Sequence, residues 1–375
     1  MLMTDASTRE SSVKQATRVA ISECSSYQDS RRALEEIFSS LGVRGLFKSG
    51  DRVLVKPNLL SARPPEEAVT THPAVVDAVL SILIDSGVRP VLGDSPASGK
   101  TVNVARVAGV ESVCKKYGVR IVTFDEGVPV KTDKGIYRRF IVAREVLEAD
   151  SIINLPKLKT HSQMTMTLAI KNTFGCIVGS EKQKWHFRAR DRNAFADMLI
   201  DLHNIIDPSL NILDGVVGMD GNGPSNGRII SPGLIAASTS GFALDDHIIR
   251  TVGVNPRVVP TALRAIQRNL IPSYEVMGDT YAYSQRFTLP ATAPLTFVPF
   301  VRFLRRFTTR FPAISESKCT RCRTCEKHCP VNAISIDDGT IDYRKCITCY
   351  VCQEICPYDA ITYKRSIFSK RRKAR

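Results

Sequence analysis

Eight of the eleven cysteines lie close together near the end of the sequence, with a spacing that is typical of a metal site. They form two runs in which two, two and three residues separate successive cysteines and a proline follows the last one. The second run begins 27 residues after the first. The runs are Cys319, Cys322, Cys325 and Cys329, and then Cys346, Cys349, Cys352 and Cys356. In an intracellular protein such clustering favours metal binding over disulfide bonds.

This repeat resembles the bacterial two-cluster ferredoxin. The resemblance implies two [4Fe–4S] clusters, each bound by three cysteines of one run and the fourth cysteine of the other run. One cluster would be bound by Cys319, Cys322, Cys325 and Cys356, and the other by Cys346, Cys349, Cys352 and Cys329. Zinc is the alternative, but zinc sites usually combine pairs of cysteines, not triplets. We therefore expect a small α+β ferredoxin-like domain at residues 314–363 that transfers electrons.

The larger part of the chain must supply whatever exchanges electrons with this module. Residues 17–271 alternate between strand-like and helix-like patterns, which predicts an α/β domain with a mainly parallel sheet and helices on both faces. The predicted strands are residues 51–55, 90–94, 119–124, 151–155, 210–214 and 234–238. The predicted helices are residues 71–84, with Thr71 as the N-cap, 102–117, 192–206 and 243–252.

Polar side chains follow several of these strands. Ligands bind at the carboxyl ends of the strands in such sheets, so we expect these side chains to form a substrate pocket. Turn formation is the alternative reason for Asn and Asp at strand ends, but lysines are not turn formers. The predicted pocket residues are Lys56, Asn58, Asp94, Ser95, Asn172, Asp214, Asp220 and Asn222.

The segment 157–161 carries the candidate catalytic residues. If it is extended, Lys157, Lys159 and His161 share one face, and Lys171 adds a further cation. This cationic face suits a small anionic substrate, such as a carboxylate or a phosphate, or a developing oxyanion. His161 could also donate a proton near neutral pH. For His72, His186 and Trp185 a structural role is the simpler interpretation.

A set of short motifs in a fixed order resembles the bacterial and archaeal family known as domain of unknown function 362. The motifs include VKPNLL at 55–60, GDSP at 93–96, NLPKLKTH at 154–161, IKNTFGCIVG at 170–179 and DGVVGMDGNGP at 214–224. The resemblance implies an iron–sulfur protein with an α/β domain and no assigned reaction.

Two glycine-rich segments do not match nucleotide-binding motifs. Residues 93–101 have one residue too many for a P-loop and a proline within it. Residues 221–227 are not followed by the helix that would hold a pyrophosphate. No flavin or nicotinamide motif is recognised, so any further cofactor stays unknown.

The net charge of +15 fits either a solvated basic tail that keeps the protein soluble or attraction to an acidic partner, a membrane surface or nucleic acid, and the tail alone does not choose among these. We expect a flexible N-terminus at 1–16, a linker at 272–313 with an amphipathic basic stretch, and a basic tail at 364–375. The stretch could pack on its own domain or contact a membrane surface. Nucleic-acid binding ranks last, because no aromatic or base-reading motif accompanies the charge. The first residues lack a secretory signal, so we expect a cytoplasmic protein.

The sequence is compatible with two functions. The first is an oxidoreductase that passes electrons through the clusters to or from an anionic substrate, with a redox partner protein or a small electron donor at the other end. The second is a non-catalytic electron carrier or assembly partner of a larger redox enzyme. A closed cleft around the lysines would favour the enzyme, and an open face would favour the carrier.

Overall fold

The computed structural model describes residues 16–189, 191–293 and 310–365. The predicted flexible N-terminus (except its last residue), most of the amphipathic stretch in the linker and most of the basic tail lie outside the described residues. No helix in the described ranges is long and apolar enough to cross a membrane.

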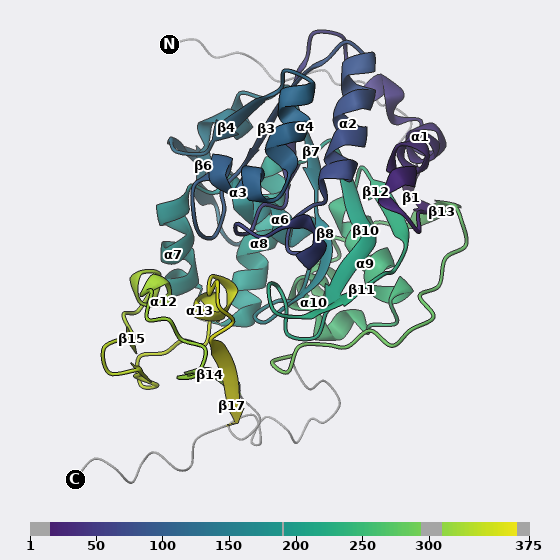
Figure 1. Cartoon of the computed structure of the whole chain (residues 1–375). Coiled ribbons are helices and arrows are strands. Elements are labelled where there is room, and N and C mark those ends of the chain that lie inside the picture. Colours follow the sequence, from purple (N-terminus) through teal and green to yellow (C-terminus); the bar gives the residue numbers. More distant parts are fainter. Residues whose placement is uncertain (1–15, 190, 294–309, 366–375) are drawn as a thin grey trace, which may run out of the picture.

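One mainly parallel sheet forms the centre of the α/β domain, as predicted (Figure 1). Its main strands lie in the order β13-β1-β12-β10-β7-β2-β3-β4, and β12 runs antiparallel to its neighbours β1 and β10. These strands are β1 (Thr17–Glu23), β2 (Arg52–Pro57), β3 (Arg89–Asp94), β4 (Arg120–Thr123), β7 (Ser151–Leu155), β10 (Leu210–Asp220), β12 (Leu234–Ser238) and β13 (Tyr274–Gly278).

Three short strands extend the sheet at the end of β10. β8 (Lys157–His161) pairs with β10, β9 (Thr165–Thr167) pairs with β8, and β11 (Arg228–Ile230) pairs with β10. β8 follows β7 after one residue, so the chain continues past the carboxyl edge of the sheet. The segment 157–161 is therefore extended, and each of its residues is buried.

Helices cover both faces of the sheet because its central strands are apolar on both sides. Along β2, Val53 and Val55 pack into one core while Leu54 packs into another, as the two-residue period of a strand requires. The first core contains α1 (Ser30–Leu41), α2 (Pro73–Asp85), α3 (Thr101–Val107) and α4 (Val110–Lys116). The opposite face carries α8 (Arg192–Ile206), α9 (Gly241–Thr251) and α10 (Pro260–Gln267).

Two details of the predicted helices were wrong. The helix predicted at 102–117 is two helices, since Gly109 adopts a left-handed conformation with φ +74° that separates α3 from α4. The N-cap of α2 is His72 in place of Thr71. The hydroxyl of Thr71 instead donates a hydrogen bond to the carbonyl of Leu155 and accepts one from the N–H of Asn58, which ties the start of α2 to β7 and β2.

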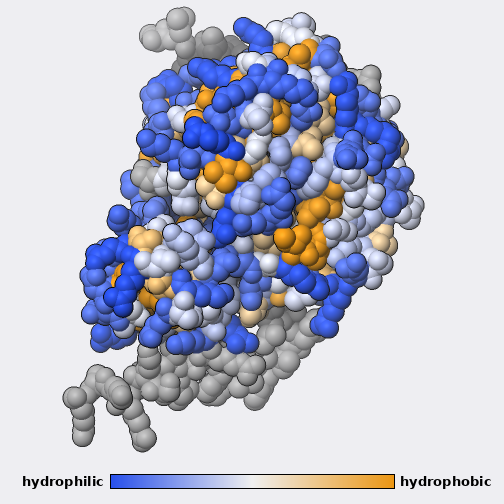
Figure 2. All heavy atoms as spheres, viewed as in Figure 1, coloured by the Kyte–Doolittle hydropathy of each residue, from blue (hydrophilic) through white to orange (hydrophobic). Residues whose placement is uncertain are grey.

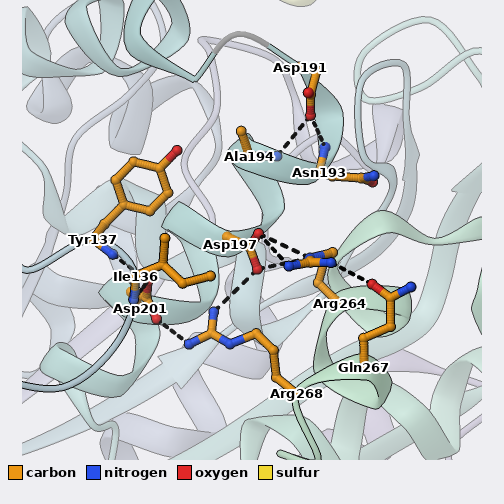
Figure 3. A network of polar contacts seen from close by, with 10 residues as sticks. All are labelled: Ile136, Tyr137, Asp191, Asn193, Ala194, Asp197, Asp201, Arg264, Gln267 and Arg268. Carbon is orange, nitrogen blue, oxygen red and sulfur yellow. Dashed lines mark hydrogen bonds and ion pairs between the residues drawn. The ribbon is translucent and has the colours of Figure 1, made fainter.

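A buried ion-pair network fixes α8 to α10 and to the hairpin of β5 (Gly127–Lys131) and β6 (Arg139–Ala143) (Figure 3). Asp197 pairs with Arg264 and Arg268, and Asp201 pairs with Arg268. Asp201 also accepts hydrogen bonds from two backbone N–H groups of the hairpin turn, those of residues 136 and 137. The network holds α8 in place behind the site described below.

The cysteine-rich module lies next to α7 (Gly179–Arg188) and α8 (Figure 1) and forms a distinct lobe in the space-filling view (Figure 2). Its elements are β14 (Arg310–Ile314), α12 (Thr324–Lys327), β15 (Ile334–Ser335), β16 (Thr340–Ile341), α13 (Val351–Glu354) and β17 (Ile361–Arg365). The two short helices α5 (Arg144–Leu147) and α6 (Ala169–Asn172) complete the α/β domain.

Polar contacts join the module to the α/β domain. The Ser162 hydroxyl lies 3.0 Å from the Gln353 side-chain oxygen, and the Ser225 hydroxyl donates to the carbonyl of Glu354. Arg63 pairs with Asp359 at 3.2 Å. These contacts place α13 directly over the carboxyl edge of the sheet.

Candidate functional site: a cationic cavity between the two domains

A cavity of about 400 Å³ lies where α13 meets the carboxyl edge of the sheet. The α/β domain contributes the residues after β2 and β3, parts of β8 and β9, and α6 and α7. The module contributes His328, Val351 and Glu354. His328 and Val351 directly precede Cys329 and Cys352, so the wall of the cavity continues into the cysteine runs.

Most of the predicted site residues line this cavity. They are Asn58, Asp94, Ser95, Lys159, His161, Lys171 and Asn172. The glycine-rich segment after β3 also contributes its residues 95–99 to the wall. The structure places five other predicted residues outside the wall: Lys56, Lys157, Asp214, Asp220 and Asn222.

Lys157 and Asp214 neutralise each other away from the cavity. They are register partners on β8 and β10, and the ammonium lies 2.7 Å from the carboxylate, with neither side chain exposed. Tyr27 completes the group, since its hydroxyl lies 2.7 Å from the ammonium and 3.1 Å from the carboxylate. Lys157 and Asp214 were predicted to belong to the site, and this prediction is corrected. The pairing of β8 with β10 directs Lys157 to Asp214 and away from the cavity.

Asp220 and Asn222 also have structural roles. Asp220 binds Arg228 through two hydrogen bonds and accepts another from the backbone of Thr288. The side-chain oxygen of Asn222 accepts from the N–H of Ala291, and its carbonyl accepts from the side chain of Gln353 at 3.1 Å. Both were predicted to line the pocket, but they hold the loop after β10 in place, and Asn222 does so against the module.

Lys56 lies behind the wall and pairs with Asp94. Their charged atoms are 2.9 Å apart, and the side chains are 0% and 4% exposed. The second carboxylate oxygen of Asp94 accepts the N–H of Leu59. Gly175 packs against this pair so closely that a Cβ atom there would overlap Asp94 and lie 2.7 Å from the Lys56 ammonium. The pair leaves no net charge at this part of the wall.

Lys159 is almost completely buried, at 1% exposure, and its ammonium donates to the carbonyl of Val69. Burial lowers the pKa of Lys159 to about 7, while the charge of Glu354 acts in the opposite direction. Its side chain can therefore gain or lose a proton near neutral pH.

His161 is neutral at that pH, because burial lowers its pKa to about 4. Its Nδ1 atom accepts the backbone N–H groups of Gln163 and Met164 at 3.1 and 3.2 Å, so the single ring proton lies on Nε2. Nε2 lies 3.5 Å from the Glu354 carboxylate of the module. His161 therefore offers an N–H donor, which corrects the expectation that it donates a proton.

Two charged residues of the wall were not predicted, namely Lys182 on α7 and Glu354 on α13. The Lys182 ammonium donates to the carbonyl of Ser95, and burial lowers the pKa of Lys182 to about 8. The ammoniums of Lys171 and Lys182 lie 5.5 and 5.9 Å from the centre of the Phe174 ring. The motif at 170–179 lies just before Lys182 in the sequence and was the signal by which Lys182 could have been predicted. No sequence signal pointed to Glu354, because only the docking of the module brings it to the wall.

His186 and Thr167 complete the polar wall. His186 stacks on Phe195 of α8 with ring centres 4.6 Å apart, and burial lowers its pKa to about 3, so it is neutral. Its Nδ1 atom, the hydroxyl of Thr167 and the side-chain oxygen of Asn58 are buried without a hydrogen-bond partner among the described residues. Such atoms are rare in folded proteins and favour a polar ligand in the cavity.

The two cysteine runs fold alike. Left-handed residues recur at the same offset, with Arg321 and Arg323 in the first run and Thr348 and Tyr350 in the second. The backbone N–H groups four residues after Cys329 and Cys356 donate to their sulfurs, at 3.2 and 3.3 Å. The sequence repeat is thus also a repeat of backbone conformation.

The thiols gather in two groups that each draw on both runs. Cys329, Cys346, Cys349 and Cys352 line one small cavity. Burial and the neighbouring thiols of Cys356, Cys322 and Cys319 together raise the pKa of Cys325 to about 11. Within the described ranges no three His, Cys, Asp or Glu side chains are placed to hold a single ion. Cubane ligands, in contrast, each bind a different iron atom, so both groups fit [4Fe–4S] clusters.

Comparison with known proteins identifies both parts of the chain. The sequence model of a family described as domain of unknown function (DUF362) matches residues 53–250, and that of a 4Fe–4S dicluster domain matches residues 318–366. A thylakoid-associated protein of Synechocystis sp. is 40% identical over 243 residues, which cover 64% of this chain and 75% of that protein.

Solved structures give only a distant likeness. The lactate racemase apoprotein of Thermoanaerobacterium thermosaccharolyticum has a TM-score of 0.39 and 10% identity, over 64% of this chain and 58% of that one. A protein from Thermotoga maritima has a TM-score of 0.39 and 13% identity, over 58% of this chain and 56% of that one. The chain thus spans less than two thirds of the length of either.

Proposed function

The chain belongs to the family described as domain of unknown function 362 and carries a 4Fe–4S dicluster domain, and on this basis we propose that it is an oxidoreductase. It would pass electrons between two [4Fe–4S] clusters in the module and a small anionic substrate in the cavity. A redox partner protein or a small electron donor would exchange electrons with the clusters at the outer side.

One observation carries this proposal: residues of both domains line the cationic cavity. Lys159, Lys171 and Lys182 line it from the α/β domain, and residues adjacent to cluster-binding cysteines line it from the module. A carrier that only docks a larger enzyme needs no such cavity. The proposed ligands of the two clusters are Cys319, Cys322, Cys325 and Cys356, and Cys346, Cys349, Cys352 and Cys329.

The charge of each side chain suggests whether it would bind the substrate or transfer a proton. Lys171 and Lys182 would bind the anionic group of the substrate, and the Nε2–H of His161 would donate to an oxygen on it. Lys159, with a pKa near 7, would supply or accept the proton that accompanies electron transfer. Bound clusters supply or accept electrons one at a time.

The test is anaerobic reconstitution followed by reduction with dithionite, with both cluster signals followed by EPR. Unsaturated carboxylates and phosphates are then screened for reoxidation of the reduced protein. We expect one class to reoxidise the clusters, and Lys171→Met to slow this reaction at least tenfold while Lys184→Met does not. Lys184 is the matched control because it lies on α7, is exposed and pairs with Glu181.

Two reducible clusters that no small molecule reoxidises would contradict the enzyme and leave the carrier or assembly partner. A cytoplasmic location also stays a prediction. Because the Synechocystis relative is thylakoid-associated, fractionation of the native host should compare the soluble and membrane fractions.

A further inference from the structure

The wall of the cavity carries an excess of positive charge. A ligand with a single negative charge would not neutralise this excess. Three lysines line the wall, namely Lys159, Lys171 and Lys182. Two acids line it as well, but Asp94 is already neutralised by Lys56 behind the wall. Glu354 is the remaining acid, so the wall carries a formal excess of two positive charges when the lysines are protonated.

Of the three histidines that line the wall, His161 and His186 do not add to this excess, because burial keeps both neutral at pH 7. Like charges in a buried site raise the free energy of the empty protein, and here burial and neighbouring lysines lower the pKa of Lys159 and Lys171. A bound anion would relieve this repulsion. An anion with two negative charges would relieve it fully.

Unpartnered polar atoms independently indicate that a ligand fills the cavity. His186 Nδ1, Thr167 Oγ1 and Asn58 Oδ1 are all buried and lack a partner among the described residues. All three residues line this one cavity, and their side chains come from different elements. A volume of about 400 Å³ is within the range of small-molecule sites.

We propose that the cavity selects small acids that carry two negative charges, such as a dicarboxylate or a phosphate monoester, over acids that carry one. This inference rests on the proposed function, since it names the class of anion that the same cavity would hold. Lys171 and Lys182, whose ammoniums lie 5.5 and 5.9 Å from the centre of the Phe174 ring, would bind one anionic group, and Lys159 would bind the other.

The test is a binding measurement that needs no electron transfer. The reconstituted full-length protein is titrated anaerobically by calorimetry at pH 7 and 150 mM salt, which screens the general attraction of anions to a protein of charge +15. Succinate is compared with butyrate, which has the same number of carbons and one charge. Glycerol 3-phosphate is compared with glycerate, so that the two sources of a double charge are distinguished.

We expect at least one dianion to bind ten times or more tightly than its monoanionic counterpart, because a charged hydrogen bond contributes about a factor of ten or more. Lys182→Met should remove most of this preference, Lys182→Arg should retain it, and Lys184→Met should change affinity less than twofold. Lys171→Met provides a second variant if Lys182→Met does not fold, which fluorescence of Trp185 would reveal.

Equal affinity for mono- and dianions, or equal losses in Lys182→Met and Lys184→Met, would overturn the inference, as would the absence of measurable binding by either dianion. Equal affinities would leave the proposed function standing, since a monoanion could still be the substrate. Tight dianion binding without reoxidation of the clusters would instead contradict the proposed function alone.

Discussion

Replacing Lys159 with methionine should stabilise the protein, although this residue has a central place in the proposed mechanism. Burial lowers the pKa of Lys159 from 10.5 to about 7. At 1.36 kcal/mol per pKa unit, the buried ammonium costs about 5 kcal/mol at pH 7 and below. The variant leaves the carbonyl of Val69 without its donor, which costs about 1–3 kcal/mol. The net stabilisation is therefore about 2–4 kcal/mol.

The pH dependence identifies the cause. Between pH 7 and 10.5 the unfolded chain keeps the Lys159 proton that the folded protein has released, so the wild type gains stability with rising pH on account of this group. The advantage of Lys159→Met should therefore be largest below pH 7 and should shrink steadily above it. Urea unfolding under anaerobic conditions, followed by Trp185 fluorescence from pH 6 to pH 9.5, measures this difference.

Trp185 is a suitable probe because it is the only tryptophan and is buried against Phe140 in the α/β domain. Lys184→Arg is the control, because arginine keeps the ion pair with the buried Glu181 carboxylate, and its expected change is within about 0.5 kcal/mol at every pH. If Lys159→Met is destabilising at pH 6, or if its effect is the same at pH 6 and pH 9.5, the reasoning about the buried ammonium is refuted.

Three further predictions concern packing, the ion-pair network and the clusters. Gly175→Ala should cost about 3–5 kcal/mol in urea unfolding because its methyl group breaks the buried ion pair behind the cavity, whereas Gly179→Ala, with no atom within 4 Å of the added Cβ, should be tolerated. Arg268→Met should cost about 3 kcal/mol, because it removes the cation that pairs with the buried Asp201 in the network of Figure 3; a loss below 1 kcal/mol would contradict a structural role. Cys329→Ala and Cys349→Ala should abolish the same one of two EPR signals, and loss of different signals would show that the runs do not exchange ligands.

The sequence by itself determined the features that depend on local pattern. The cysteine spacing identified an iron–sulfur module, because three of the four ligands of each cluster lie close together in the chain and need only a short loop to meet. The strand–helix alternation predicted the mainly parallel sheet, and the position of Lys159 and His161 just after a buried strand placed them at its carboxyl edge.

Only the tertiary structure decided which polar residues face the cavity. Lys157 and Lys159 alternate on one strand with the same sequence signal, yet strand pairing gives Lys157 an aspartate partner and leaves Lys159 at the cavity wall. Pairing across a sheet depends on register between segments more than fifty residues apart, which the local pattern does not specify.

The protonation states were equally inaccessible from the sequence. His161 has an ordinary pKa near neutrality as an isolated residue, but burial makes it a neutral donor and moves Lys159 into the neutral range. Desolvation depends on everything packed around a group, and here part of that packing comes from a second domain. The docking of the module also brings Glu354 to the wall, because contacts between domains arise from surfaces that form only after each domain has folded.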